Sequence, residues 1–220
     1  MIPRPARLAL ALMLAGGFAL DAHSARAAAL GVVVGLDRCG ISGDAPQNIE
    51  YNFESGGLAG VQGEFGIGQD ISLSLQPMYV RRRTEVKGAA EGKSTGERIL
   101  DLSLDYIAVP VVVKFSAARG RTYVAGGVDL AFLNSARITG EGIDEDAKRF
   151  FSNLDVGAVL GFGVVFPIGR PRLTTELRYV QGLVNLAGDE QGAATQDLPN
   201  RFHSEGWQLT AGILFPLGGH

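Results

Sequence analysis

Stretches in which every second side chain is apolar recur along the chain from Leu30 to Phe215. In residues 30–36, for example, Leu30, Val32 and Val34 alternate with other side chains. A period of two places alternate side chains on opposite faces of a pleated strand, so these stretches predict β-strands. Eight such stretches are present, at about residues 30–36, 57–67, 71–79, 100–115, 124–132, 154–166, 173–179 and 207–215.

Short and long connections alternate between the predicted strands. Three to five residues join the second strand to the third, the fourth to the fifth and the sixth to the seventh. The other links are long, at about residues 38–56, 83–98, 134–153 and 183–205. Such long loops are rare in compact soluble domains, whereas short periplasmic turns that alternate with long outer loops are typical of outer-membrane barrels.

The first residues predict export from the cytoplasm. Residues 1–28 have the three parts of a signal peptide: a basic start, an apolar run at 8–20, and small residues that place cleavage near Ala27 to Ala29. The run is shorter than the about 20 residues that a membrane-spanning helix needs. We therefore expect residues 29–220 to form one outer-membrane barrel domain.

The two faces of the strands differ in side-chain size. The less apolar face is rich in glycine, serine and threonine, which suits the interior of an eight-stranded barrel, where there is little room. A soluble barrel would present lysine and glutamate on its water-facing side. The sequence thus predicts an all-β, eight-stranded antiparallel up-and-down transmembrane β-barrel, with its bulky aliphatic side chains facing lipid.

Aromatic residues occur at both ends of the predicted outward face. Such rings collect where hydrocarbon meets water, so they predict two girdles. The girdle at the loop end is expected to hold Tyr79, Tyr106, Phe132, Tyr179 and Trp207. The girdle at the turn end is expected to hold Phe65, Phe115, Phe166 and Phe215. Tyr123 has inward parity and joins neither girdle.

The fourth predicted strand changes phase. Leu102 and Leu104 follow one alternation, whereas Val111 and Val113 follow the opposite one. Because one extra residue moves all later side chains to the other face, we expect a bulge near residues 106–110.

Several ionisable residues have inward parity. They are Glu64, Lys114, Asp129, Asp155, Glu176 and Arg178, with Gln62, Gln76 and Gln208 as polar neighbours. The favoured interpretation is a structural plug of paired charges, because buried ions persist only when they are partnered. The alternative is a conduction path or proton relay, but an eight-stranded barrel leaves no open aqueous channel.

Three other motifs invite chemical interpretations that we do not favour. His203-Ser204-Glu205 resembles a hydrolase set, but adjacent residues of a strand face opposite sides. Asp144-Glu145-Asp146 lacks the spacing of a calcium loop and is expected to be a solvated acidic turn. Arg81-Arg82-Arg83 is positioned for lipopolysaccharide phosphates, although an ordinary charged collar is the favoured interpretation.

Composition narrows the function classes. The formal net charge is -3, which does not favour a nucleic-acid partner. Cys39 is the single cysteine, so no internal disulfide forms, and the usual companions of a metal site are missing. We expect no catalytic residues, no metal and no cofactor.

Two segments carry a family resemblance. Residues 75–79 (Leu-Gln-Pro-Met-Tyr) and 106–115, which run from a tyrosine through Pro110 to Phe115, resemble the third and fourth strands of the small outer-membrane β-barrel domain family. That family includes PorT-like proteins and is akin to the OmpA and OmpX barrels. Ala108 stands where the family often has an acidic residue, and five residues follow Phe215, where many barrels end. The resemblance covers nearly the whole mature chain and implies no catalytic residue.

The expected function is an envelope-structural or surface-interaction role in the bacterial outer membrane, without enzymatic activity. The alternatives are a lipid-modifying enzyme and a narrow porin-like pore. Expected partners are outer-membrane lipid and lipopolysaccharide, the barrel-assembly machinery during biogenesis, and an extracellular ligand bound by the loops. We expect a monomer.

Overall fold

The computed structural model describes residues 28–43, 49–88, 97–117, 120–140, 143–186 and 202–217, and every structural statement below concerns these residues. They are almost wholly β-strand, with a short 3-10 helix, η2 (Lys148–Phe150). No helix in this part of the chain is long and apolar enough to span a membrane. Residues 1–27, which hold nearly all of the predicted signal peptide, lie outside it, so the leader remains a prediction.

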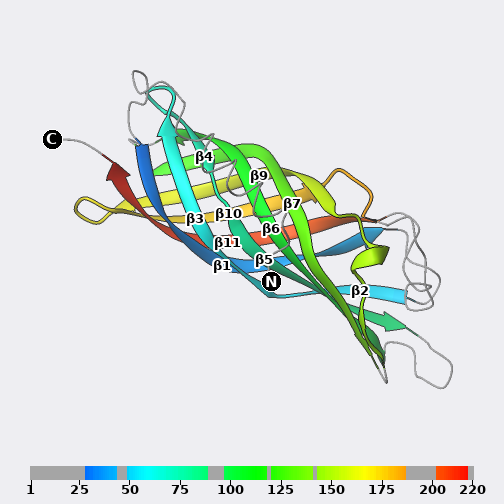
Figure 1. The fold of residues 1–220 in the computed structure, drawn as a ribbon. Helices are drawn as coiled ribbons and strands as arrows, with labels where there is room; N and C mark the ends of the chain where they lie inside the picture. Colours follow the sequence, from blue (N-terminus) through cyan, green and yellow to red (C-terminus); the bar gives the residue numbers. More distant parts are fainter. Residues whose placement is uncertain are drawn as a thin grey trace.

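Antiparallel strands form a closed ring with eight positions (Figure 1). Their order around the ring is β1 (Ala28–Gly43), β3 (Gly56–Gly66), β4 (Ile71–Leu75) continued by β5 (Met78–Gly88), β6 (Glu97–Ala117), β7 (Thr122–Gly140), β9 (Leu154–Pro167), β10 (Arg172–Gly182) and β11 (Phe202–Leu217). The ring closes because β1 pairs with β3 on one side and with β11 on the other. The predicted all-β up-and-down barrel is confirmed.

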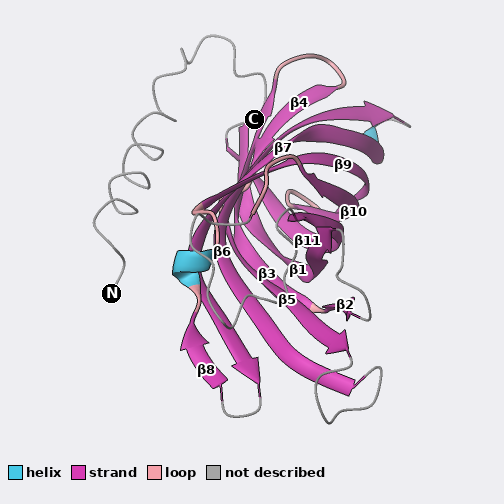
Figure 2. Ribbon diagram, turned by 90° about the vertical axis from the view of Figure 1, so that its right-hand side faces the viewer, coloured by secondary structure: helices cyan, strands magenta, loops and turns pink. Residues whose placement is uncertain are grey.

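The two ends of the barrel differ in their connections. At the turn end, Ala28 pairs with both Leu217 and Phe65, and short connections join β3 to β4, β6 to β7 and β9 to β10. At the opposite end, the loop end, β2 (Ile49–Glu54) pairs with β5 and β8 (Ile143–Asp146) pairs with β7. The sheet therefore extends past the ring on one side, as Figure 2 shows for β7 and β8.

Several strands continue further toward the loop end than the apolar alternation indicates. The first strand ends at Gly43, and the third barrel strand resumes after Pro77 and continues to Gly88. In these extensions the outward positions are polar, as at Arg38 and Arg81. Because backbone pairing continues while outward hydrophobicity stops, the sequence pattern underestimates the strand lengths.

The expected bulge occurs at the predicted level along the barrel axis, but it is on β7 and not on β6. The register between β6 and β7 shifts at Asp105 and Tyr106, and Asn134 of β7 is the extra residue. β6 itself keeps one phase, since residues from Leu102 to Lys114 at every second position are buried. The predicted face change along β6 is therefore wrong, because the apolar residues at its start face the interior and not lipid.

The barrel interior changes character along its axis. Toward the loop end, buried apolar side chains of β1, β3, β5, β6 and β7 form a hydrophobic core with Phe150, Phe151 and Leu186. The strand residues of this core are Val33, Leu58, Met78, Val80, Leu102, Leu104, Tyr106, Ala108, Ala131, Leu133, Ala136 and Ile138. Closer to the turn end, the buried residues are mostly polar or charged. The predicted small and polar interior is found in this second half, whereas the loop-end half is mainly apolar but also buries a group of polar residues around Arg82.

Candidate functional site: two ion-pair clusters inside the barrel

The six charged residues with inward parity all lie inside the barrel. They are Glu64, Lys114, Asp129, Asp155, Glu176 and Arg178. Gln62, Gln76 and Gln208 are buried beside them. Apart from Gln62, the structure sorts these residues into two groups, which other buried residues join. The Arg82 cluster comprises Asp37, Arg82, Asp129, Asp155, Ser204 and Gln208. The Glu176 cluster comprises Glu64, Gln76, Lys114, Tyr123, Glu176 and Arg178.

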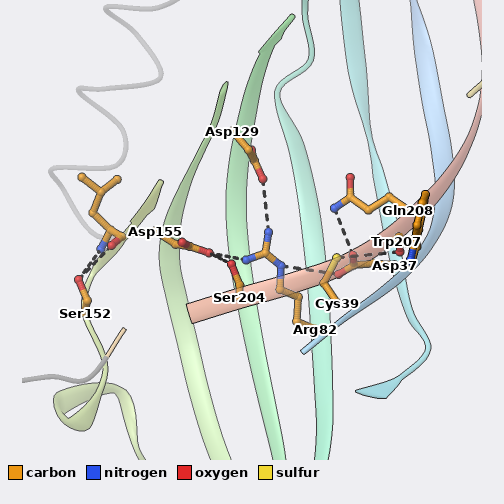
Figure 3. A network of polar contacts seen from close by, with 10 residues as sticks. Asp37, Cys39, Arg82, Asp129, Ser152, Asp155, Ser204, Trp207 and Gln208 are labelled. Carbon is orange, nitrogen blue, oxygen red and sulfur yellow. Dashed lines mark hydrogen bonds and ion pairs between the residues drawn. The ribbon is translucent and has the colours of Figure 1, made fainter. Parts of the chain in front are cut away.

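A single guanidinium joins three carboxylates in the Arg82 cluster (Figure 3). Arg82 Nη1 lies 2.6 Å from Asp155 Oδ2, Nη2 lies 3.3 Å from Asp129 Oδ2, and Nε lies 3.7 Å from Asp37 Oδ2. These carboxylates come from β9, β7 and β1, whereas Arg82 belongs to β5. All four side chains are at most 3% exposed. The guanidinium thus ties four strands together across the interior.

Neutral side chains complete this cluster. Ser204 Oγ donates a hydrogen bond to Asp155 Oδ2 at 2.6 Å, and Gln208 Nε2 donates one to Asp37 Oδ1 at 3.1 Å. The Arg82 guanidinium also lies over the ring of Tyr106, 4.8 Å from its centroid. Such a contact between a cation and an aromatic face is favourable, and more so in a desolvated site.

Sequence reasoning missed Asp37, Arg82 and Ser204 as interior residues. The alternation of the third predicted strand already assigns inward parity to Gln76 and Met78, and counting on by twos reaches Arg82. Arg82 lies beyond the predicted strand because the apolar alternation of that strand ends at Tyr79. Asp37 was missed for the same reason, one residue beyond the predicted end of the first strand.

In the Glu176 cluster, two side chains contact the carboxylate of Glu176. Tyr123 Oη donates a hydrogen bond to Glu176 Oε2 at 2.8 Å, and Arg178 Nε pairs with Glu176 Oε1 at 3.0 Å. Arg178 Nη2 donates a further hydrogen bond to Gln76 Oε1 at 2.8 Å. Gln76 in turn donates to Ser74 Oγ at 3.1 Å. Tyr123, which had inward parity without an assigned role, is thereby placed against Glu176.

The same cluster continues toward the turn end. Lys114 Nζ lies 3.0 Å from Glu64 Oε2 and 4.7 Å from the centroid of the Tyr123 ring. Arg172 Nη2, which is partly exposed, lies 3.3 Å from Glu64 Oε1. Charged groups in this half of the interior are therefore partnered, as the burial of ions requires.

The outer surface of the barrel carries most of the predicted girdle aromatics. Tyr79, Phe132 and Trp207 near the loop end are exposed, as are Phe115, Phe166 and Phe215 near the turn end. Phe65 and Tyr179 are half-buried, and the Tyr179 ring lies 5.1 Å from that of Trp207. The assignment of Tyr106 to the girdle is wrong, because its side chain is buried inside the barrel against Arg82. The positions of the other rings relative to a membrane stay a prediction.

The three consecutive arginines do not form one phosphate-facing group. Arg82 faces the interior, whereas Arg81 and Arg83 face outward because side chains alternate along β5. Arg81 Nε pairs with Asp105 Oδ1 at 2.7 Å, and its Nη2 donates a hydrogen bond to Tyr79 Oη at 3.1 Å. Ser135 Oγ donates to Asp105 Oδ2 at 3.0 Å. This network crosses β5, β6 and β7 just beyond the apolar outer surface.

The side chains of the hydrolase-like motif His203-Ser204-Glu205 alternate between the two faces of β11. His203 is exposed, whereas Ser204 is buried and bonded to Asp155. A nucleophile needs its base within hydrogen-bond reach, and these two side chains face opposite sides of β11.

Among the described residues, no group of three or more histidine, cysteine, aspartate or glutamate side chains could hold a metal ion. Cys39 is a free, buried thiol whose Sγ donates to the carbonyl of Trp207 at 3.9 Å. The side chains of Asp144 and Glu145 lie outside the described residues, while Asp146 Oδ1 accepts a hydrogen bond from the Lys148 amide at 2.9 Å.

Several solved structures of outer-membrane proteins are similar to this chain. The chain is similar to the outer membrane protein OprG from Pseudomonas aeruginosa, with 11% identity, a TM-score of 0.57, and coverage of 90% of this chain and 98% of that one. Neisserial surface protein A matches with 14% identity, a TM-score of 0.45, and coverage of 86% and 96% respectively. Ail of Yersinia pestis matches with 12% identity, a TM-score of 0.44, and coverage of 86% and 98%. At 11% identity, the likeness to OprG shows the fold alone.

A sequence-family comparison goes further. No curated protein matches the sequence. The family model for the outer membrane protein beta-barrel domain, however, matches residues 16–188, which is most of the chain. This match indicates the bacterial outer membrane as the location. The chain belongs to the outer membrane protein beta-barrel domain family.

Proposed function

We propose that this protein is a non-enzymatic outer-membrane barrel with a sealed interior, which serves envelope structure or surface interaction through its loops. The observation that carries the proposal is the Arg82 cluster, in which one guanidinium binds carboxylates from three other strands. Such a cross-barrel network fills the centre of an eight-stranded ring, where side chains already occupy the available space.

Besides the Arg82 cluster, apolar side chains at the loop end would block the passage of ions, which supports the proposal. Phe150, Phe151 and Leu186 are buried against the apolar core of the interior. The segment is fixed by backbone hydrogen bonds, from Ala147 N to Ala136 O at 3.0 Å and from Ser152 N to Leu186 O at 2.9 Å. An ion that entered from this end would have to cross apolar side chains before it reached the Arg82 cluster, which is unfavourable.

Conductance measurements test the sealed interior. Purified full-length protein, inserted in planar lipid bilayers, is expected to show no steady ion conductance in the folded state. Reproducible single-channel steps from the wild-type protein would favour the narrow-pore alternative and refute the proposal. A parallel sample of an open porin verifies that the bilayer detects insertion.

The enzymatic alternative is tested at Ser204. The protein is incubated with phospholipid and with lipopolysaccharide, and released fatty acids are measured. We expect no turnover by the wild-type protein, because Ser204 donates to Asp155 and is separated from His203. Turnover that disappears in Ser204→Ala or His203→Ala would establish the lipid-modifying enzyme instead.

We extend the proposal to the partners and to the narrower family. We assign the exposed aliphatic surface to contact with outer-membrane lipid and lipopolysaccharide, the loops to an extracellular ligand, and biogenesis to the barrel-assembly machinery, with the protein acting as a monomer. The strand segments that resemble PorT-like, OmpA and OmpX barrels support the narrower grouping. Heat-dependent migration of unboiled protein from outer-membrane fractions in detergent gels tests the folded barrel and its location together.

A further inference from the structure

The Arg82 cluster holds more acidic than basic groups. Its guanidinium is the one cation that contacts Asp37, Asp129 and Asp155, and all four side chains are buried (Figure 3). If every group were ionised, the cluster would bury two negative charges without a counter-ion. Such an excess is costly, and a buried acid in this situation commonly becomes neutral by binding a proton.

The three carboxyl groups receive unequal hydrogen bonding. Asp155 Oδ2 lies 2.6 Å from Arg82 Nη1 and also accepts a hydrogen bond from a serine hydroxyl at 2.6 Å. Asp129 Oδ2 accepts one from Arg82 Nη2 at 3.3 Å. Asp37 receives none from the guanidinium, because its Oδ2 lies 3.7 Å from Nε; its Oδ1 accepts a hydrogen bond from the neutral amide of Gln208. Since hydrogen bonds from a cation favour the ionised acid, Asp155 is the best stabilised anion and Asp37 the least.

The uncharged side chains around Asp37 supply no counter-charge. Cys39, two residues along β1, is a buried thiol, and Tyr106 of β6 contacts the Arg82 guanidinium with its ring. Burial keeps both groups uncharged at neutral pH, because it disfavours the thiolate and phenolate forms. On the two strands that pair with β1, the register partners of Asp37 are Gly56 and Gln208.

The other buried cations of the described residues are already paired. Arg178 of β10 acts electrostatically on the cluster, but its Nε lies 3.0 Å from Glu176 Oε1. Lys114 pairs with Glu64 near the turn end. A metal cation among the three carboxyl groups would be repelled by the guanidinium that already contacts them. A proton bound to one carboxyl group therefore fits the cluster best in both size and charge.

We propose that the Arg82 cluster is a proton-binding site in which Asp37 carries a proton at neutral pH. A proton on Asp37 Oδ2 leaves Oδ1 free to accept the hydrogen bond from Gln208, while Asp129 and Asp155 stay ionised beside the guanidinium. The cluster then buries one excess negative charge instead of two. Alkaline pH releases the proton to solvent and restores the second excess charge, so the barrel loses stability as the pH rises.

Proton counting sets the sign of this pH dependence. An aspartate of the unfolded chain releases its proton near pH 4. Between about pH 5 and 7 the folded protein therefore holds one proton more at Asp37 than the unfolded chain does, and its stability falls as the pH rises. This group alone increases the unfolding equilibrium constant by about tenfold per pH unit. Asp37→Asn resembles the neutral acid and lacks this contribution.

Urea titrations in lipid vesicles at several pH values test the proposal. Between about pH 5 and 7, the unfolding constant of the wild-type protein is expected to rise more steeply than that of Asp37→Asn, by about tenfold per pH unit. At about pH 7, Asp37→Asn is expected to lower the unfolding constant by about tenfold or more, because asparagine needs no proton. The matched control, Asp155→Asn, removes an ionised partner of Arg82 and should raise it by about tenfold or more. Equal pH slopes for the wild type and Asp37→Asn would refute a proton on Asp37.

Infrared spectroscopy of the wild-type protein in bilayers detects the proton directly and needs no variant. With carbon-13 in the aspartate side-chain carboxyl groups, the carbonyl band of a protonated acid is expected at about pH 7, where exposed aspartates are ionised. Absence of this band would overturn the proposal. Asp37→Asn should lose the band and Asp129→Asn should keep it. The reverse pattern would place the proton on Asp129 and overturn the assignment to Asp37.

Discussion

Arg82 and Asp155 are 73 residues apart in sequence, yet Nη1 of the first lies 2.6 Å from Oδ2 of the second inside the barrel. The same arginine also reaches Asp129 and Asp37. Removing it would leave three buried carboxylates without their shared counter-charge. Its neighbour Arg81 lies on the outer surface, where it pairs with one partly exposed carboxylate, that of Asp105.

Arg82→Ala is therefore expected to lower the free energy of unfolding by about 3–5 kcal/mol, the cost of breaking a buried ion pair from one side. Arg81→Ala on the same strand is the control, with an expected loss below about 1 kcal/mol, because exposed ion pairs contribute little. Urea titrations in lipid vesicles measure both values. Similar losses for the two variants would contradict an interior position for Arg82.

The Tyr123 hydroxyl provides a second test of the interior network. Tyr123→Phe removes the donor to Glu176 and is expected to cost about 1–3 kcal/mol, because a buried charged acceptor is left with one partner fewer. Tyr179→Phe removes a hydroxyl that donates to Gln181 in a partly buried contact, and its cost should be clearly smaller. Unfolding titrations that rank the two variants in the reverse order would count against this assignment.

The lipid-facing surface is tested on β10. Leu177 is exposed on the outward face, so Leu177→Arg is expected to cost about 2–4 kcal/mol if it lies near the bilayer midplane. Leu183 is also exposed but lies one residue beyond the loop end of β10. Leu183→Arg is expected to cost about 1 kcal/mol or less. Equal tolerance at both positions in a folding titration would contradict a membrane-facing surface at Leu177.

The packing of Tyr123 makes Gly163 a sensitive position. A Cβ atom added at Gly163 would overlap the Tyr123 ring, so Gly163→Ala is expected to cost about 1–3 kcal/mol through overpacking. At Gly126 an added Cβ would meet only one atom, at 4.0 Å, and Gly126→Ala is the matched control with little effect. In a Tyr123→Ala background the cost of Gly163→Ala should fall, because the clashing ring is gone; an unchanged cost would exclude this cause.

Much of the interior could be predicted by parity alone. The period of two placed Glu64, Lys114, Glu176 and Arg178 inside the barrel, and it also gave the inward parity of Tyr123. These residues lie on strands whose outward positions are apolar, so both faces are marked by composition. Parity says which way a side chain faces, but it does not say which residues of other strands it meets.

The sequence by itself determined the eight strands, their up-and-down order and the lipid-like character of the outer surface, because local alternation is set by the pleat of each strand. Tertiary structure decided the rest. Ring closure and strand stagger place Arg82 beside Asp37, Asp129 and Asp155. The Tyr106 side chain faces the interior, where it packs in the apolar core near the loop end. Pairing between strands far apart in the chain depends on register and barrel closure, which no local pattern encodes.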